Sequence, residues 1–179
     1  MTEPRDLRTD DQLKLAKLIG KQRVAMLAMT AANGLLEAKP MTLLEHDAHG
    51  HLWFFCEAEP QDAVMRERYK TANLSFSDEP HATYVSISGR GELLHDRERI
   101  HALWSPMAKP WFPDGPDSPR LALLKFIPSQ AETWDGPSSS VLRLLALAAS
   151  VVSGKPVGMG EHAVLTEVHT PHSTPESAA

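Results

Sequence analysis

The chain has 179 residues, with 18 basic and 23 acidic side chains, and therefore a formal charge of −5 with its histidines neutral. This length favours one compact domain, and a content of 42% hydrophobic and 23% charged residues indicates a globular protein rather than a disordered one. The single cysteine, Cys56, excludes an intramolecular disulfide framework and fits a reducing cytoplasm, which is the expected location. A mildly acidic chain lacks the cationic field that nonspecific binding to nucleic acid requires, so no nucleic-acid partner is expected.

A membrane location is also not expected. The first twelve residues carry mixed charges without an apolar core, so they do not resemble a secretory signal. The longest apolar stretch, Val141 to Val152, has 12 residues and includes Arg143, whereas a helix that crosses a bilayer needs about 20.

The N-terminal part of the chain predicts a helix followed by two β-hairpins. Residues 9–20 predict the helix, because apolar side chains recur there at helical spacing after a Thr-Asp pair that can cap it. The apolar runs 24–30 and 35–44 flank Asn33-Gly34, which is typical of a tight hairpin turn. A second hairpin is expected to join the end of that run to 52–56 through a polar turn.

The middle of the chain alternates between short helices and strands. A helix is expected with Pro60 in its first turn, and strands are expected over 72–77 and 83–94. The two glycines in the second of these strands indicate a bulge or a tight barrel corner. Asp96 can cap a further short helix, and residues 121–134 contain a stretch suited to a strand.

The C-terminal part predicts a last helix and a tail. Three serines before Val141 cap an amphipathic helix over 139–153, and residues 169–179 are expected to be disordered because they are rich in Pro, Ser and Thr without periodicity. Strands at short intervals, broken by small helices, favour a mainly β fold of the α+β kind, built on a closed or partly closed antiparallel barrel.

One segment rich in tryptophan and proline points to a family. It reads Trp104-Ser105-Pro106-Met107, then Lys109-Pro110-Trp111-Phe112-Pro113-Asp114-Gly115, then Ala131-Glu132-Thr133-Trp134-Asp135-Gly136-Pro137. Together with the earlier Ala38-Lys39-Pro40-Met41 and Trp53-Phe54-Phe55, it resembles bacterial general stress proteins of the pyridoxamine 5′-phosphate oxidase-like, FMN-binding split-barrel family. The resemblance covers roughly residues 9 to 168.

This resemblance implies a fold, an assembly and a cofactor. The fold would be a six-stranded antiparallel split β-barrel with short α-helices, forming one domain over 1–168. The family implies a homodimer with two FMN molecules in clefts between the subunits, and FAD is a possible alternative flavin. The protein must then neutralise the flavin phosphate, hydrogen-bond the ribityl chain and enclose the isoalloxazine ring.

The resemblance also implies which residues bind the flavin. The family meets the phosphate with a cation from the second strand and with a Ser and a Lys where the next strand turns into a helix. The ring lies along the backbone of an Arg-Pro-Met segment, and aromatic side chains close over it. Carried onto this chain, the candidate cofactor-binding residues are Lys39, Pro40, Met41, Phe54, Phe55, Cys56, Asp62, Arg66, Trp111 and Phe112.

Several of these positions depart from the family pattern. Lys39 stands where the family usually has Arg, so it keeps the charge but loses the planar fork that grips a phosphate with two donors. Cys56 stands where a Thr hydroxyl is common, and a thiol is a weaker donor. Pro60 replaces the expected Ser and Asp62 the expected Lys, which reverses a charge.

The reversed charge weakens the expected phosphate site. Glu57, Glu59 and Asp62 place three carboxylates near the start of the helix, and one like charge at 6 Å costs about 2.8 kcal/mol at an effective dielectric near 20. Arg66, one turn after Asp62, can pair with it and offset part of this repulsion. Alternatively, the carboxylates simply complement the helix dipole. The sequence leaves three outcomes open: loose FMN binding, binding of another flavin or similar ligand, or loss of the cofactor.

Other candidate sites have simpler interpretations. His46, His49 and His51 crowd one turn, but a polar hairpin loop explains them as well as a metal does, and no metal site is expected. Trp111 and Phe112 are either core aromatics or residues of the flavin cleft. No general acid or base stands out, so catalytic residues stay unassigned.

Three functions of different classes follow. The first is a flavin-dependent oxidoreductase of an unknown small substrate, and the second is a flavin carrier or sensor without turnover. The third is a cofactor-free dimeric scaffold of the same fold. Oxidation of pyridoxamine 5′-phosphate itself is disfavoured, because residues 169–179 lack the Arg-Leu-x-Pro segment with which such oxidases hold their substrate.

Overall fold

The structure, a computed structural model, describes residues 9–20, 22–60, 62–135, 150–151, 161–166 and 168. The described residues form the α-helices α1 (Asp10–Ile19), α2 (Ala63–Arg68) and α3 (Arg97–Leu103), together with the 3-10 turns η1 (Glu79–His81) and η2 (Pro106–Ala108). The strands are β1 (Val24–Thr30), β2 (Leu36–His46), β3 (Leu52–Glu57), β4 (Ala72–Asp78), β5 (Thr83–Leu94), β6 (Leu121–Asp135) and β7 (Glu161–Leu165).

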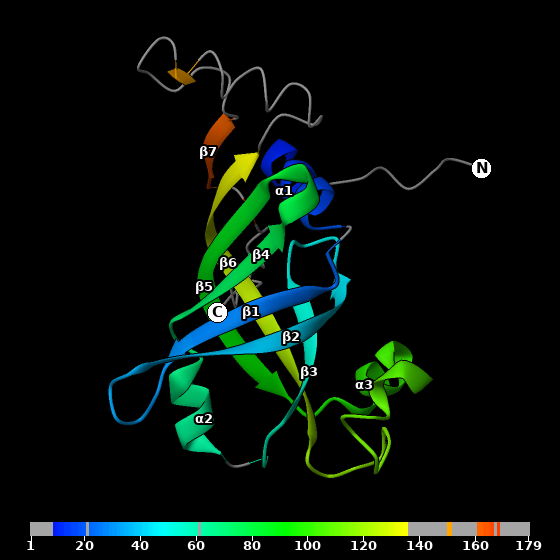
Figure 1. Ribbon diagram of the computed structural model, residues 1–179. Coiled ribbons are helices and arrows are strands. Elements are labelled where there is room, and N and C mark those ends of the chain that lie inside the picture. The colour runs from blue at the N-terminus through cyan, green and yellow to red at the C-terminus, as the bar shows by residue number, and fades with distance from the viewer. Residues whose placement is uncertain are drawn as a thin grey trace, which may run out of the picture.

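The strands form one antiparallel sheet that closes on itself (Figure 1). Their order is β3-β2-β1-β4-β5-β6-β7, and a further pairing joins β3 to β6. Six strands therefore make a closed barrel, which confirms the expected six-stranded antiparallel barrel in a mainly β fold with short helices. Closure pairs β3 with β6, so neither strand presents unpaired backbone groups to another chain over the residues that this pairing covers.

β7 is an additional strand that the sequence did not predict. The N-terminal half of β6 pairs with β3 from Leu121 to Phe126, whereas its C-terminal half pairs with β7 from Ala131 to Asp135. β6 can serve two partners because it is 15 residues long and extends past the end of β3. The barrel is thus split at this end, where β7 continues the sheet instead of closing it.

The helix and hairpin signals act locally, and most of them are confirmed. The Thr9 hydroxyl accepts a hydrogen bond from the backbone N–H of Gln12 and caps α1, and Asp96 caps α3 in the same way. Gly34 takes a positive φ of 82° in the turn between β1 and β2, a conformation that favours glycine. The expected position of Pro60 was wrong: the Asp62 carboxylate caps α2, so the helix begins at Ala63 and Pro60 lies before its first turn.

The expected irregularity near the two glycines is also confirmed. The register between β5 and β6 shifts between Ser88 and Gly89. A Cβ atom at Gly89 would lie 2.3 Å from the backbone oxygen of Ile127, so only glycine allows the strands to approach this closely.

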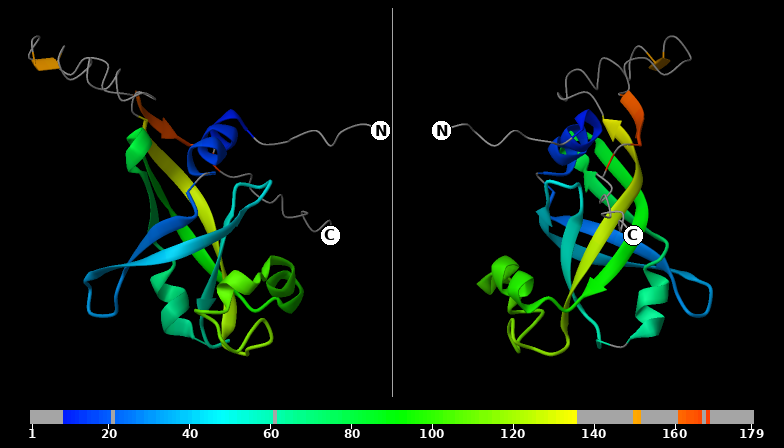
Figure 2. Two further views of the ribbon diagram at one scale, coloured as in Figure 1. Left: turned by 45° about the vertical axis from the view of Figure 1, so that its right-hand side comes forward. Right: turned by 180° about the vertical axis from the view of Figure 1, so that it is seen from behind.

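The hydrophobic residues form two clusters on opposite sides of the barrel wall. The larger one fills the barrel and includes Leu27, Phe54 and Phe76, all of them almost completely buried. The smaller one lies outside β3 and β6, where Trp53 and Phe55 pack under α3 with the partly buried side chains of the following loop. α1 lies at one end of the barrel, and α2 and α3 lie toward the other end (Figures 1 and 2).

Two predictions concern parts of the chain that the structure barely describes. Of the helix expected over 139–153, only residues 150–151 are described, and the tail over 169–179 lies wholly outside the described residues. Both stay predictions, as does the domain boundary at residue 168. In the part of the chain that is described, no helix has the length and apolar character needed to cross a bilayer.

Candidate functional site

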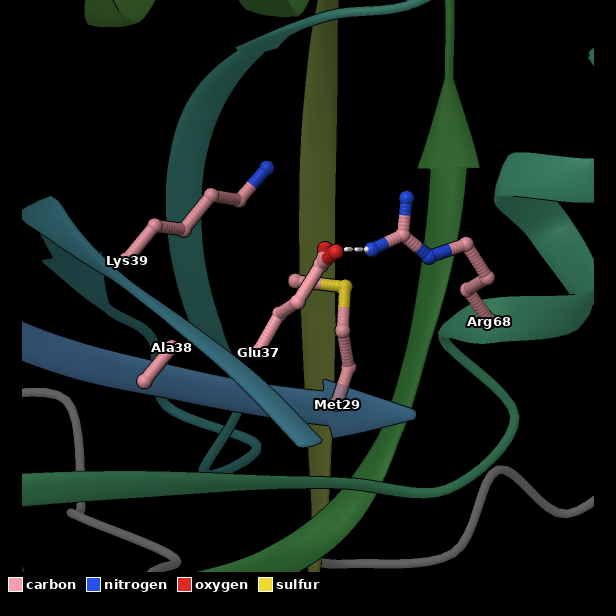
Figure 3. Close-up of a pocket in the computed structure, with 5 residues that line it drawn as sticks. All are labelled: Met29, Glu37, Ala38, Lys39 and Arg68. Carbon is pink, nitrogen blue, oxygen red and sulfur yellow. Dashed lines mark hydrogen bonds and ion pairs between the residues drawn. The ribbon is translucent and has the colours of Figure 1, made fainter. Parts of the chain in front are cut away.

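A pocket lies where β2 passes the C-terminal end of α2. Its volume is about 260 Å³. It is lined by Met29, Glu37, Ala38, Lys39 and Arg68 (Figure 3). Side chains alternate along a strand, so Glu37 and Lys39 lie on the same face of β2. Figure 3 shows the charged ends of Lys39 and Arg68 reaching into the same space from β2 and α2.

Lys39, the predicted phosphate-binding cation, lies in this pocket. Its ammonium nitrogen donates a hydrogen bond of 3.1 Å to the phenol oxygen of Tyr69, the residue that follows α2. Burial lowers the pKa of Lys39, and the neighbouring Arg68 adds to this effect, whereas Cys56 and Glu37 oppose it. Burial therefore costs the charged ammonium group free energy. An anion in the pocket would offset part of that cost, because it would offer the ammonium group a partner of opposite charge.

Arg68 supplies a second cation that the sequence analysis did not identify. Its guanidinium group forms an ion pair with the Glu37 carboxylate, drawn as the dashed line in Figure 3. Its Nε atom is buried and has no hydrogen-bond partner among the described residues. The pocket therefore holds two cations against one carboxylate, with donor capacity that its own residues do not use.

The charges at the start of α2 are arranged differently from the sequence interpretation. The Asp62 carboxylate accepts a hydrogen bond of 2.8 Å from the backbone N–H of Met65, which makes it the N-cap of the helix. The Arg66 guanidinium donates to the carbonyl oxygen of Pro60 at 2.8 Å rather than to the Asp62 side chain. Neither Asp62 nor Arg66 lines the pocket that contains Lys39.

The other two carboxylates near this helix have a cationic partner. The Arg120 guanidinium lies 3.1 Å from Glu57 and 3.7 Å from Glu59. Arg120 reaches them because β3 and β6 pair with Glu57 opposite Leu121, which brings the preceding residue alongside. These contacts offset part of the negative charge that the sequence placed around the start of α2, though surface ion pairs of this kind are worth little individually.

The remaining candidates on β2 and β3 are divided between the two faces of the barrel wall. Met41 and Phe54 belong to the barrel interior, and Cys56 lies there too, only 5% exposed. Pro40 points the opposite way and is exposed, whereas Phe55 packs in the outer cluster under α3. The period of two along each strand makes this division unavoidable, so adjacent residues of a motif cannot all contact one ligand face.

The loop aromatics lie near the outer cluster. The Phe112 ring is 5.9 Å from the Phe55 ring, which in turn is 5.7 Å from Trp104. Trp111 is 69% exposed and belongs to neither cluster. Within one chain, then, the structure places Lys39 in the pocket and the aromatic candidates elsewhere.

Cys56 and His51 belong to residue types that often react or bind metals, but both side chains are buried. Burial raises the pKa of the Cys56 thiol to about 12, which leaves it protonated at neutral pH. His51 is also buried, and its ring hydrogen-bonds the Asp47 carboxylate at 3.1 Å. Over the described stretches, no group of three or more His, Cys, Asp or Glu side chains is arranged to hold a metal ion.

Sequence reasoning missed Glu37 and Arg68, which line the pocket, and Tyr69, whose phenol oxygen accepts a hydrogen bond from Lys39. The alternation of β2 carried a signal for Glu37, which is two residues before Lys39. Arg68 and Tyr69 carried none, because the rotation of a six-residue helix against a strand depends on tertiary packing.

The closed antiparallel barrel, with Lys39 and Arg68 lining a pocket beside its second strand, has the architecture of a split-barrel protein. Residues 10–157 match the model of the family described as "Pyridoxamine 5'-phosphate oxidase like". The chain belongs to the pyridoxamine 5′-phosphate oxidase-like family, and this confirms the resemblance found in the sequence.

Known relatives agree with this assignment. The chain is similar to the general stress FMN/FAD binding protein from Xanthomonas citri, with 31% identity, a TM-score of 0.59, and coverage of 72% of this chain and 90% of that one. General stress protein 26 from Bacillus anthracis shares the fold, with 18% identity, a TM-score of 0.58, and coverage of 68% and 92%. "Protein bli-3" of Neurospora crassa is 22% identical over 151 residues, which are 79% of this chain and 72% of that protein.

Proposed function

We propose that this protein binds a flavin nucleotide, FMN or alternatively FAD, with the phosphate end in the pocket between β2 and α2. The observation that carries the proposal is the pair of cations, Lys39 and Arg68, that face one another there. Lys39 belongs to the Lys39-Pro40-Met41 segment that resembles the phosphate-binding strand of the family. A relative with 31% identity is described as an FMN/FAD binding protein.

The residues of the pocket fit a phosphate group. The buried Nε of Arg68 lacks an acceptor among the residues that the structure describes, and the Lys39 ammonium donates to a neutral phenol. A phosphate supplies several anionic acceptor oxygens, and charge-assisted hydrogen bonds to them are stronger than neutral ones. The volume of about 260 Å³ is below the roughly 300–1,000 Å³ of pockets that enclose a whole small ligand, so we place only the phosphate end inside.

The flavin ring then needs a second surface, and we propose that a partner subunit provides it. Within one chain, Met41 and Phe54 lie in the barrel interior, and Trp111 is exposed on a loop. A homodimer in which the cleft lies between two barrels would bring exposed residues of both chains to the ring. A cytoplasmic location fits the single buried Cys56.

The chemistry proposed for the holoprotein is flavin-dependent oxidation and reduction of an unknown small substrate. A bound flavin supplies electron or hydride transfer, and the protein sets its position and electrostatics. This chain's own contribution would be to bind the phosphate through Lys39 and Arg68. The alternative is a flavin carrier or sensor without turnover, because the charged side chains that line the described pocket, Glu37, Lys39 and Arg68, are taken up by the ion pair and by the proposed phosphate binding.

A cofactor-free scaffold is the second candidate, and one contact favours it. Glu37 already neutralises Arg68, so the pocket is internally balanced except for Lys39. A flavin titration distinguishes these functions. We expect FMN fluorescence to be quenched on adding the protein, Lys39→Ala to weaken binding at least tenfold, and Lys39→Arg to retain it.

The control for this titration is Lys70→Ala, which removes one charge from an exposed ion pair with Glu67. A protein that purifies colourless and does not quench FMN would favour the scaffold. If flavin binds, reducing it and testing nicotinamide or disulfide acceptors separates an oxidoreductase from a carrier, because only the former accelerates reoxidation.

A further inference from the structure

The ion pair between Glu37 and Arg68 lies in the wall of the pocket, where the phosphate is proposed to bind. We infer that Glu37 stands in for the ligand phosphate: its carboxylate holds the Arg68 guanidinium before a ligand binds and releases it to a phosphate monoester. Arg68 then becomes the second phosphate-binding cation. It takes over the role of the lysine that the family has at the position of Asp62. This inference rests on the proposed function.

The exposure of the two partners indicates which of them moves. The Glu37 side chain is 57% exposed, whereas that of Arg68 is 24% exposed. Glu37 can therefore turn into solvent and regain its hydration, while Arg68 stays where packing holds it. Half-exposed ion pairs contribute little to stability, so the exchange of one anionic partner for another costs little.

The Nε donor of Arg68 favours the replacement of Glu37 by a phosphate. Its Nε atom is buried without an acceptor among the described residues, although the same guanidinium contacts Glu37. Glu37 thus satisfies only part of the guanidinium. A phosphate has more acceptor oxygens than a carboxylate and carries a second charge, so it can satisfy both Arg68 and Lys39.

The positions along α2 explain why Arg68 can replace the missing lysine. Asp62 is the N-cap of the helix, and Arg68 is its last residue, six positions later. At a rise of about 1.5 Å per residue, the two are about 9 Å apart along the axis. A phosphate between Lys39 and Arg68 therefore avoids the carboxylate that stands at the family's lysine position.

The ligand class follows from the same charges. With Glu37 turned away, the pocket presents two cations, which match the dianion of a phosphate monoester such as FMN. Riboflavin has the same ring and ribityl chain but no phosphate, so it cannot displace Glu37 from Arg68. The ratio of FMN affinity to riboflavin affinity therefore reports on the pocket alone.

The test measures the dissociation constants of FMN and riboflavin by fluorescence in the wild type and in variants of the full chain. We expect Arg68→Ala to weaken FMN binding about tenfold or more, Arg68→Lys to retain part of it, and Glu37→Gln to tighten it several-fold. Riboflavin binding should not change in any of them. The matched controls are Glu67→Gln and Lys70→Ala, which remove the same charges from the neighbouring exposed pair and should leave the ratio unchanged.

The measurements distinguish a failure of this inference from a failure of the proposed function. If FMN binds but Arg68→Ala and Arg68→Lys leave the ratio at the wild-type value, the inference is wrong and the proposed function stands. Weaker FMN binding by a folded Glu37→Gln variant would also overturn it, since Glu37 would then support the site instead of competing for it. If neither flavin binds, the proposed function fails, and thermal stabilisation by inorganic phosphate decides the inference: it should be larger in Glu37→Gln and absent in Arg68→Ala. No stabilisation of the wild type by phosphate would overturn both.

Discussion

The ammonium nitrogen of Lys39 lies 3.1 Å from the phenol oxygen of Tyr69, and this contact joins β2 to the end of α2. Tyr69 is itself held in place, because its ring is completely buried and its backbone oxygen accepts a hydrogen bond of 2.7 Å from Gly91 on β5. The predicted phosphate-binding lysine is thus fixed by a residue that no sequence motif indicated. Its charged form is also destabilised, since burial lowers the pKa of Lys39.

The lowered pKa of Lys39 predicts how flavin binding depends on pH. A bound phosphate favours the charged ammonium, so affinity requires the protonated form. We expect FMN affinity to fall as the pH rises through the Lys39 pKa, which lies below the ordinary 10.5. Fluorescence titration at increasing pH measures this fall.

The variant Lys39→Arg is the control for this pH dependence. A guanidinium stays charged over the whole range, so the fall in affinity should disappear or move to higher pH. A fall that originates in the flavin ring would persist unchanged in the variant. That result would contradict a role for the Lys39 ammonium in binding.

Asp62 is expected to affect stability and FMN binding in opposite ways, through its cap and through its charge. Asp62→Ala removes the acceptor for the Met65 N–H and should lower the free energy of unfolding by about 1 kcal/mol, whereas Asp62→Asn retains an acceptor and should cost less. Both variants remove a negative charge about 9 Å along the helix from Arg68, so both should tighten FMN binding by about threefold to tenfold.

Asp62→Lys extends the same comparison. It restores the charge that the family carries at this position, so it should tighten FMN binding more than Asp62→Asn does, despite the loss of the cap. Denaturant unfolding and flavin titration measure the two effects independently. An unchanged affinity in all three variants would show that a charge at position 62, about 9 Å along the helix from Arg68, does not act on the bound phosphate.

Gly89 and Gly91 are expected to respond differently to an added methyl group. A Cβ at Gly89 would meet a backbone oxygen of β6 at 2.3 Å, whereas one at Gly91 would meet the flexible end of Leu124 at 2.6 Å. We expect Gly89→Ala to lower the free energy of unfolding by about 2–3 kcal/mol and Gly91→Ala by about 1 kcal/mol, because a side-chain end can move and a paired strand cannot. Urea denaturation of the two variants gives the comparison, and a larger loss for Gly91→Ala would contradict this account of the bulge.

The sequence predicted the features that depend on neighbouring residues. The Asn33-Gly34 turn, the cap at Thr9 and the irregularity at Gly89 each follow from the conformational preferences of a few adjacent residues, and the structure has all three. The spacing of the strands indicated an antiparallel barrel, and the family resemblance supplied its six-stranded split form and the role of Lys39. Features that depend on distant segments were missed, because no local signal carries them.

Arg120 and Arg68 illustrate the difference. Arg120 meets Glu57 only because β3 and β6, some sixty residues apart, pair in one particular register. Arg68 meets Glu37 only because a short helix packs against β2 in one rotation. In both cases the sequence shows the charged residues but not which of them pair. The sequence therefore suggests a larger net negative charge around α2 than the folded protein has there.

The buried Cys56 is expected to be unreactive in the folded protein. Burial raises the pKa of this thiol to about 12, so it stays protonated at pH 8, and the side chain is only 5% exposed. Reaction with a thiol reagent should therefore require unfolding, and its rate should rise with denaturant in parallel with loss of structure. Rapid labelling of the native protein, at a rate independent of denaturant, would contradict the barrel-interior position of this thiol.

Asp47 organises the turn between β2 and β3 and should make the protein sensitive to acid. Burial alone would raise the pKa of Asp47, but hydrogen bonds from the His51 ring, the Trp53 indole at 2.8 Å and the His51 backbone outweigh it and hold the pKa far below the ordinary 3.8. A carboxyl whose folded pKa is lowered contributes stability that is fully present above 3.8 and is lost as the pH falls toward the folded value.

We therefore expect Asp47→Asn to be less stable than the wild type by about 1.5–3 kcal/mol at neutral pH, because hydrogen bonds to a charged acceptor are replaced by bonds to a neutral amide. The difference should shrink as the pH falls below 3.8, where the unfolded wild type takes up a proton that the folded one does not. Free energies of unfolding measured from neutral to acidic pH test this directly. The exposed Asp117, which contacts His101 at 2.8 Å, provides the control, and Asp117→Asn should change stability little at any pH. A constant difference between wild type and Asp47→Asn across the acid range would show that the Asp47 contacts act through shape alone and not through charge.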